Sequence, residues 1–178
     1  TGSDNTAVGR SALNNNTIGG ANSAFGHYAL LSNTTGNYNT AVGRSALGSN
    51  TTGIYNTAVG FSCLGFNTTA GGNSAFGAYA LYLNTSGAGN TTVGTNSLRY
   101  NTFGNNNSAF GGSALNYNTT GISNTSVGSV SLYFNTTGKN NTAVGASCLF
   151  SNKTGNNNTA VGVESLSNNI TNNNSAFG

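Results

Sequence analysis

Side chains that could perform acid–base or nucleophilic chemistry are few and far apart in this sequence. The 178-residue chain has one histidine, His27, and its two acidic residues are Asp4 and Glu164. General acid–base catalysis needs titratable groups within hydrogen-bond reach of one reacting atom. A serine nucleophile likewise needs a base beside it. Since the three residues cannot supply such a cluster, we predict that the chain is not an enzyme.

The sequence also lacks the usual patterns for cofactors and metals. Its glycines recur within the string NTAVG, which is not a phosphate-binding loop. The Gly-Gly-x-Gly-x-Asp repeat that binds Ca²⁺ in some solenoids is missing. We therefore expect no cofactor and no metal site, and we interpret His27, beside Tyr28, as a surface residue.

The two cysteines, Cys63 and Cys148, are separated by five repeats of the unit described below. At about 4.8 Å per stacked unit they would lie about 24 Å apart, whereas a disulfide allows roughly 7 Å between Cα atoms. They cannot pair within one chain. We interpret them as small apolar residues, with a thiol contact between chains as the alternative.

Charge and hydropathy exclude other classes of partner. Charged residues make up 4% of the chain, against about a quarter in ordinary domains. The basic residues are scattered, so we expect no nucleic-acid partner; they are Arg10, Arg44, Arg99, Lys139 and Lys153. No apolar run approaches the ~18 residues of a membrane span, so this segment should not insert into a membrane.

An internal repeat dominates the sequence. The string NTAVGRSAL stands at residues 5–13 and again at 39–47, and an Asn opens each unit at intervals of 17 residues from Asn5 to Asn158. One further unit opens at Asn174, after 16 residues. We number each unit from this Asn as position 1. Position 4 is always Val or Phe, and position 9 is Leu in all ten complete units.

A short and constant period predicts a solenoid in which each unit forms one coil. Seventeen residues suit two short strands, at positions 1–5 and 7–10, with glycine corners near positions 5 and 15. The predicted fold class is all-β: a parallel β-solenoid with 17-residue coils, forming a single repeat domain over residues 1–178. Because neither end resembles a cap, we expect a segment of a longer array.

Side-chain alternation predicts a large-residue face and a small-residue face. We place the large residues inside, as a core ladder of Val8, Phe25, Val42, Val59, Phe76, Leu13, Leu30, Leu47, Leu64 and Leu81. The small face then points outward, toward another chain. Its position-3 ladder contains Ala7, Ala24, Ala41, Ala58 and Ala75. This arrangement favours a homo-oligomer of three chains side by side.

Asparagines at positions 1 and 12 are expected to form amide ladders from coil to coil. The position-1 ladder includes Asn5, Asn22, Asn39, Asn56 and Asn73. Position 12 opens an N-x-[ST] triplet, the acceptor for N-glycosylation, in eight units. These are Asn33, Asn50, Asn67, Asn84, Asn118, Asn135, Asn152 and Asn169. Asn16 and Asn101 lack the triplet but keep the Asn, so we predict a structural role without glycans.

Aromatic and other large apolar residues gather at positions 10 and 11. They are Phe66, Leu83, Tyr100, Tyr117 and Phe134 at position 11, with Tyr82, Tyr133 and Phe150 at position 10. Two interpretations remain open: a hydrophobic stripe buried between chains, or a ridge on which glycans stack.

The strings NTAVGRSAL…NTTG and NSAFGGSAL resemble the YadA-like head repeats of trimeric autotransporter adhesins. Similar arrays occur in fibre proteins of phages and predatory bacteria. The matching positions are those of Asn5, Ala7, Val8, Gly9, Ala12 and Gly19 and their copies. The resemblance implies a left-handed parallel β-roll with three chains side by side in an extracellular fibre or adhesin. The present unit is longer than the typical head repeat and has an added Leu-x-x-Asn segment.

These observations lead us to expect a stiff shaft segment of an extracellular fibre or surface adhesin, with filament neighbours as partners. The alternatives are a phage or virus tail-fibre shaft, an adhesin surface that binds a host glycan or receptor, and an ice-binding solenoid with Thr at positions 2 and 13. The expected location is extracellular, on a cell surface or in a virion fibre.

Overall fold

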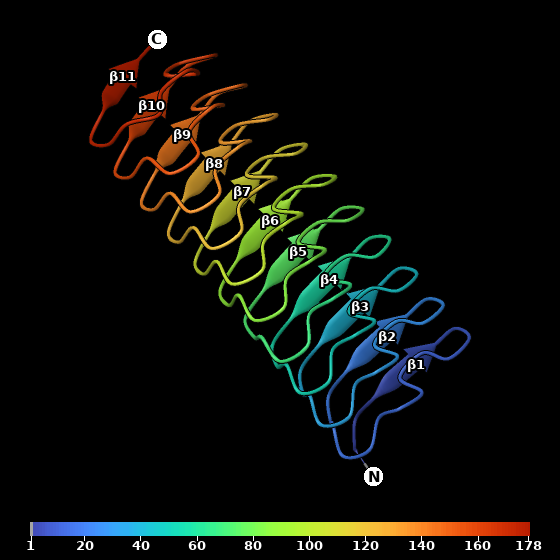
Figure 1. The fold of residues 1–178 in the computed structure, drawn as a ribbon. Helices are drawn as coiled ribbons and strands as arrows, with labels where there is room; N and C mark the ends of the chain where they lie inside the picture. Colours follow the sequence, from blue (N-terminus) through green and yellow to red (C-terminus); the bar gives the residue numbers. More distant parts are fainter. Residues whose placement is uncertain (1) are drawn as a thin grey trace.

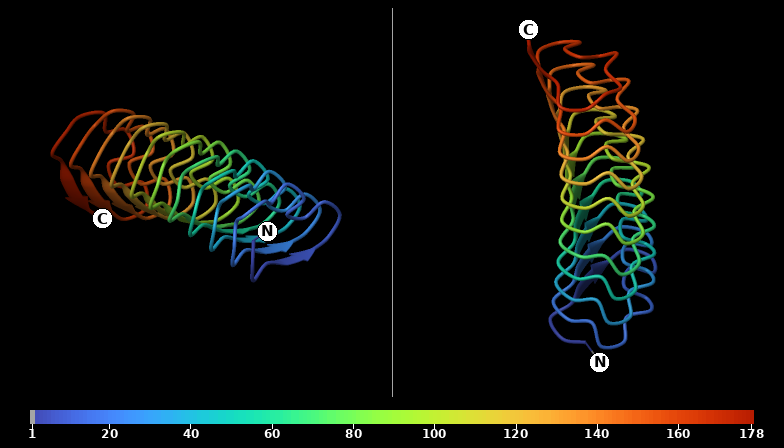
Figure 2. Two further views of the ribbon diagram at one scale, coloured as in Figure 1. Left: turned by 90° about the horizontal axis from the view of Figure 1, so that it is seen from below. Right: turned by 60° about the vertical axis from the view of Figure 1, so that its left-hand side comes forward.

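The chain folds as an all-β parallel solenoid of about ten turns. A computed structural model describes residues 2–178, and within them each 17-residue unit forms one coil and no helix is present (Figures 1 and 2). One three-residue strand per coil, at positions 2–4, pairs with the next coil, so that β1 to β11 form a single parallel sheet in chain order. The predicted solenoid and its period are confirmed.

The eleven strands occupy equivalent places in their coils. Their bounds are β1 Thr6–Val8, β2 Ser23–Phe25, β3 Thr40–Val42, β4 Thr57–Val59, β5 Ser74–Phe76, β6 Thr91–Val93, β7 Ser108–Phe110, β8 Thr125–Val127, β9 Thr142–Val144, β10 Thr159–Val161 and β11 Ser175–Phe177. Equivalent residues lie opposite each other, as Ala41 does to Ala58. Every position therefore forms a column along the solenoid.

The second predicted strand, at positions 7–10, is absent from the described coils. The backbone there turns through left-handed conformations at positions 7 and 9, as at Tyr28 (φ 61°) and Leu30 (φ 49°). This side of the coil is still hydrogen-bonded to its neighbour: the Leu30 amide donates to Ala46 O at 3.0 Å. Farther on, the Thr34 amide donates to Thr51 O at 2.9 Å. Adjacent coils are thus joined on several sides and not only through the sheet.

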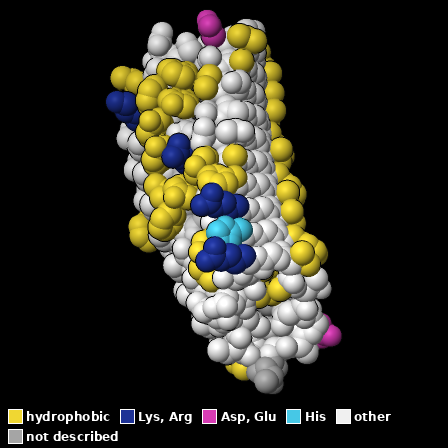
Figure 3. Space-filling model, turned by 90° about the vertical axis from the view of Figure 1, so that its right-hand side faces the viewer, with side chains coloured by type: hydrophobic (Ala, Val, Ile, Leu, Met, Phe, Trp, Pro, Cys, Tyr) yellow, Lys and Arg dark blue, Asp and Glu magenta, His cyan; other side chains and the backbone are white. Residues whose placement is uncertain are grey.

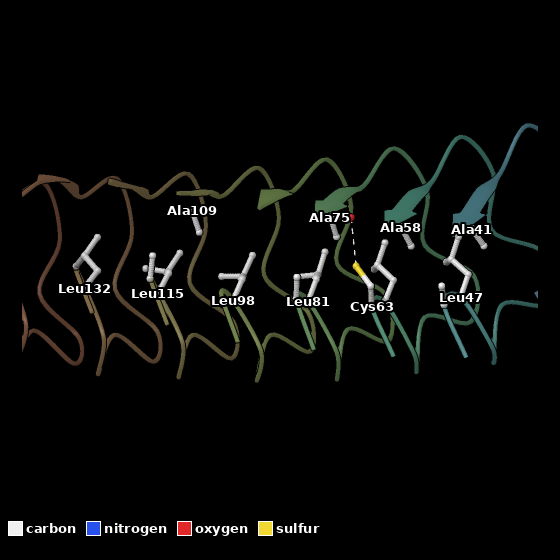
Figure 4. Close-up of a cluster of buried hydrophobic side chains, with 14 of the residues drawn as sticks. Ala41, Leu47, Ala58, Cys63, Ala75, Leu81, Leu98, Ala109, Leu115 and Leu132 are labelled. Carbon is white, nitrogen blue, oxygen red and sulfur yellow. Dashed lines mark hydrogen bonds between the residues drawn. The ribbon is translucent and has the colours of Figure 1, made fainter. Parts of the chain in front are cut away.

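The core is narrow and is filled by one leucine per coil together with small side chains. Leu at position 9 faces Ala at position 3 across the interior (Figure 4). In the core prediction, the leucines are correct: Leu30, Leu47, Leu64 and Leu81 are fully buried and Leu13 nearly so. The Val and Phe half of that prediction is wrong. Val8, Phe25, Val42 and Phe76 are 56%, 41%, 38% and 39% exposed, and Val59 is half-buried.

The predicted small-residue face is also reversed. Ala24, Ala41, Ala58 and Ala75 are fully buried and line the interior, while Ala7 of the first coil is exposed. The physical reason is space, because an interior already occupied by Leu accepts only a small side chain from the opposing strand. The alanine ladder therefore offers no surface to another chain.

Glycine at position 5 is required by both conformation and packing. Its φ lies between 116° and 140° in all eleven coils, a region open to glycine and costly for other residues. At Gly111, a Cβ atom would also lie 2.6 Å from the carbonyl carbon and oxygen of Gly128 in the next coil. The adjacent Gly112 has nothing within 4 Å of such an atom. Gly112 is therefore a suitable control position for a substitution at Gly111.

We expect Gly111→Ala to destabilise the chain by at least about 1–3 kcal/mol through backbone strain, with the clash against Gly128 adding to this cost. Gly112→Ala should stay within about 0.5 kcal/mol of the parent chain. Thermal unfolding followed by circular dichroism measures both. Equal melting temperatures for the two variants would contradict this account of the corner.

Candidate functional site

Both predicted asparagine ladders are present and converge on one carbonyl in each coil. Asn39 at position 1 donates through Nδ2 to Gly53 O at 2.8 Å and to Asn22 Oδ1 in the preceding coil at 3.2 Å. Asn50 at position 12 donates to the same Gly53 O at 3.1 Å and to Asn33 Oδ1 at 2.9 Å. The position-15 carbonyl therefore closes the coil, while the amide oxygens link successive coils.

The position-12 asparagines are poor glycan acceptors in the folded chain. Seven of the eight triplet asparagines are fully buried: Asn33, Asn50, Asn67, Asn84, Asn118, Asn135 and Asn152. Each of their Nδ2 atoms donates to the asparagine Oδ1 of the preceding coil, whereas a glycan needs that atom at the surface. Asn169 is the exception, being half-buried. The inward orientation supports the structural role that we predicted for this position.

Removing one ladder residue should cost far more than removing an exposed asparagine. Asn107→Ala leaves the Asn124 backbone amide without an acceptor, removes one of the two acceptors of the Asn124 side-chain amide, and takes one of two side-chain donors from Gly121 O. We expect a loss of about 3 kcal/mol or more, because each unsatisfied buried group costs about 1–3 kcal/mol. The control, Asn14→Ala, removes an exposed side chain that donates only to Asn15. Urea unfolding curves that coincide for the two variants would refute the ladder's importance.

The cysteine thiols lie inside the coils. Cys63 Sγ donates to Ala75 O at 3.2 Å and Cys148 Sγ donates to Ala160 O at 3.2 Å. Both cysteines are free and fully buried. They are the small interior residues that we predicted, and a thiol contact between chains is inconsistent with their position. Burial raises the pKa of Cys63 from 9.0 to about 12 and also raises the pKa of Cys148.

We expect both thiols to resist an aromatic disulfide reagent at pH 8 in the folded chain and to react fully in denaturant. The raised pKa keeps Cys63 protonated in the folded state up to about pH 12, whereas an unfolded thiol ionises near 9.0. Between about pH 9 and pH 12 the unfolded thiol releases its proton and the folded one does not, so the free energy of unfolding falls as pH rises above 9. Absorbance of the released reagent counts the thiols. Prompt reaction under native conditions would contradict the interior placement.

Threonine at position 13 is also engaged within the solenoid. The Thr34 hydroxyl donates to Thr51 O at 3.1 Å, and the same contact recurs along the column from Thr17 to Thr136. These hydroxyls stabilise the coil stack.

The first exposed surface is the outer face of the sheet. The position-4 residues of β1–β11, which we call the apolar stripe, point outward beside the Thr or Ser of position 2. Strands with Val at position 4 always have Thr at position 2, and strands with Phe always have Ser. Since positions 2 and 4 share a face, the smaller Ser leaves room for the larger ring. The stripe is continuous over the whole sheet.

The second exposed surface is an aromatic ridge on the turn side of the coils. We define it as Phe61, Phe66, Tyr79, Tyr82, Arg99, Tyr100, Tyr117, Tyr133, Phe134 and Phe150, from positions 6, 7, 10 and 11. Parallel stacks alternate with edge-to-face pairs: Tyr100 and Tyr117 have ring centroids 4.9 Å apart with planes at 7°, whereas Tyr133 and Phe134 lie at 83°. Burial and the neighbouring Tyr117 raise the pKa of Tyr133.

Arg99 lies between the ridge aromatics of the preceding coil, Tyr79 and Tyr82, and Tyr100 of its own coil. Its guanidinium carbon lies 5.0, 5.9 and 5.3 Å from the ring centroids of Tyr79, Tyr82 and Tyr100. The only side-chain hydrogen bond found for this guanidinium is a long one, from Nη1 to Asn96 Oδ1 at 3.4 Å. Its Nε is buried without a hydrogen-bond partner. Arg99 is therefore held by aromatic rings and keeps donors for another acceptor.

A short basic column continues the ridge toward the N-terminus. Arg10, His27 and Arg44 occupy position 6 in successive coils, and Figure 3 shows the histidine in line with basic side chains beside hydrophobic ones. Arg44 lies 5.8 Å from the Phe61 ring, and His27 stacks on Tyr28 at 3.8 Å. From the sequence we expected scattered basic residues and interpreted His27 as a surface residue. Their shared position in the repeat is the signal that would have grouped them.

The other end of the ridge borders an open hollow of about 700 Å³ lined by Phe134, Ser151, Lys153, Thr154 and Ile170. Over residues 2–178, no cluster of three or more His, Cys, Asp or Glu side chains could bind a metal ion. The same residues include no helix that is long and apolar enough to cross a membrane.

Comparison with known proteins gave no match: no family model, no curated protein and no solved structure is significantly similar to this chain.

Proposed function

We propose that this chain is a stiff structural segment of an extracellular fibre or surface adhesin, in which three copies lie side by side through their apolar stripes. The observation that supports this most is the stripe itself. Its residues in the middle coils, from Phe25 to Val144, are mostly 37–42% exposed, which is unusual for large side chains repeated along a whole face. Continuous exposed apolar surfaces typically mark protein interfaces.

Identical copies are the partner that suits this stripe. Every Val or Phe is spaced by one coil, about 4.8 Å, and a parallel copy has the same spacing along its full length. A partner of another fold would match only part of such a periodic surface. The pairing of Ser with Phe and Thr with Val also limits variation in side-chain bulk along the face. The left-handed winding implied by the family resemblance belongs to this proposal too.

A shaft role agrees with the way the coils are joined. Backbone hydrogen bonds, two asparagine ladders and a threonine ladder link each coil to the next, so bending the rod would break several contacts at once. A phage or virus tail-fibre shaft would need the same properties and remains an alternative location for the same rod. Ice binding is disfavoured, because position-13 hydroxyls are engaged and Phe interrupts the position-2 and position-4 face.

The oligomeric state tests the proposal. Light scattering coupled to size-exclusion chromatography should give the mass of three chains for the parent protein. Phe76→Lys combined with Phe110→Lys places two charges in the stripe and should lower that mass to one chain. The matched control is Phe103→Lys, because Phe103 is 59% exposed at position 14, away from the stripe.

Circular dichroism must show unchanged β content in both variants, since all three phenylalanines lie outside the core. A parent chain that is monomeric at micromolar concentration would refute the assembly. So would a double variant that keeps the parent mass.

A further inference from the structure

We propose that the aromatic ridge and its basic column bind a linear acidic polysaccharide, with carboxylate or sulfate groups, lying along the rod axis. This inference rests on the proposed function only in requiring the rod to be displayed outside the cell. It assigns the adhesive role to the turn side of the coil and leaves the apolar stripe for assembly.

Charge complementarity is the first step. Three arginines, Arg10, Arg44 and Arg99, lie on or beside the ridge. The two acidic residues of the chain are in its first and last coils, with Glu164 four coils beyond Arg99. Arg10 lies at the same end as Asp4, but Arg44 and Arg99 have no carboxylate in their own or adjacent coils. In a protein with 4% charged residues, this makes the ridge a distinct electropositive surface.

The second step is the availability of hydrogen-bond donors. A guanidinium has five N–H donors arranged in a fork that fits carboxylate or sulfate oxygens. Arg99 uses one of them in a long contact from Nη1 to Asn96, and its Nε is buried, so the remaining Nη donors are the ones that can reach an anion. The rings of Tyr79, Tyr82 and Tyr100 hold the side chain in place, so binding an anion there costs little side-chain entropy.

The third step is shape. The ridge has at least one ring in each of six successive coils, which lie about 4.8 Å apart, and an extended chain of pyranose rings advances by a comparable length per sugar. In perpendicular pairs such as Phe66 and Tyr82, at 85°, the edge of one ring covers a face of the other, and the ring that presents its edge keeps both faces free of its partner. They leave apolar faces for sugar C–H groups, while tyrosine hydroxyls can bond to sugar hydroxyls.

Single-stranded nucleic acid fits the same surface less well. Its bases could stack on the same open ring faces, so the difference lies in charge density. Three arginines over six coils are few for a polymer with a charge on every nucleotide. The ridge therefore favours a polymer whose charges are carried on sugar rings.

The test uses the full 178-residue chain and fluorescence-labelled oligosaccharides. The probes are a heparin dodecasaccharide, an oligogalacturonate of similar length, a neutral dextran oligomer and an oligothymidylate. We expect at least one of the two acidic sugars to bind, with affinity that falls as salt is added, and no binding of dextran. Failure of both acidic sugars to bind would overturn the proposal, and tighter binding of oligothymidylate would replace it with a nucleic-acid site.

Variants locate the site. Arg44→Gln with Arg99→Gln should weaken binding by at least about tenfold, since two charge-assisted contacts are lost. Tyr117→Leu keeps the charge and should also weaken binding. The control Lys139→Gln removes an exposed charge at position 16, away from the ridge, and should change affinity less than about twofold. If Lys139→Gln lowered the affinity as much as the double arginine variant does, binding would depend on net charge alone, and the proposed site would be refuted.

Light scattering on the same samples separates this proposal from the previous one. A monomeric chain that binds the acidic sugar through Arg44 and Arg99 would refute the assembly but support the ridge. A three-chain rod without sugar binding would do the reverse.

Discussion

The structure depends on a single acceptor in each coil, the backbone carbonyl at position 15. Two asparagine side chains, at positions 1 and 12, donate to it, as Asn39 and Asn50 do to Gly53 O. Buried amides are costly unless they are fully hydrogen-bonded, and here the remaining amide groups bond to the neighbouring coils. Closure of one coil and attachment to the next are thus the same set of contacts. This explains why positions 1 and 12 keep Asn while the outer positions vary.

Because the core is partly polar, it has room for few apolar side chains. One leucine and two small side chains fill what space the asparagines leave, so each coil buries little hydrocarbon. The larger Val and Phe side chains are left on the outer face of the sheet. In the assembly that we propose, their burial would add the stability that the interior lacks, and the measured stability would then depend on chain concentration.

The period, the parallel solenoid, the interior leucines and both amide ladders could be predicted from the repeat, because they follow from exact spacing. We predicted wrongly which face of the sheet is buried, although the asparagine ladder at position 1 indicates the correct face. An inward Asn at position 1 requires, by alternation, an inward residue at position 3 and an outward residue at position 4. Preference for burying the larger residue led to the opposite assignment.

Other features could not be inferred from residue types. Leu has no preference for the left-handed region, yet position 9 adopts φ of 48–53° in all ten coils. Only the packing of the complete coil accounts for this conformation. The basic column was missed for another reason: Arg10, His27 and Arg44 are distant in sequence and are aligned by the 17-residue period.

The one irregular coil shows which constraint is strongest. Between Asn169 and Asn174 one residue is missing, and the position-12 ladder stops there: Asn152 Oδ1 has no donor from the next coil. Closure nevertheless persists, because Asn158 and Asn169 both donate to Thr171 O, at 2.8 and 3.1 Å. The position-1 ladder also continues, with Asn174 donating to Asn158 Oδ1 at 3.0 Å. The deletion lies in the loop between the two ladders, where a shortened backbone can supply another carbonyl. Coil length can therefore change by one residue provided that two asparagine amides still meet on one acceptor.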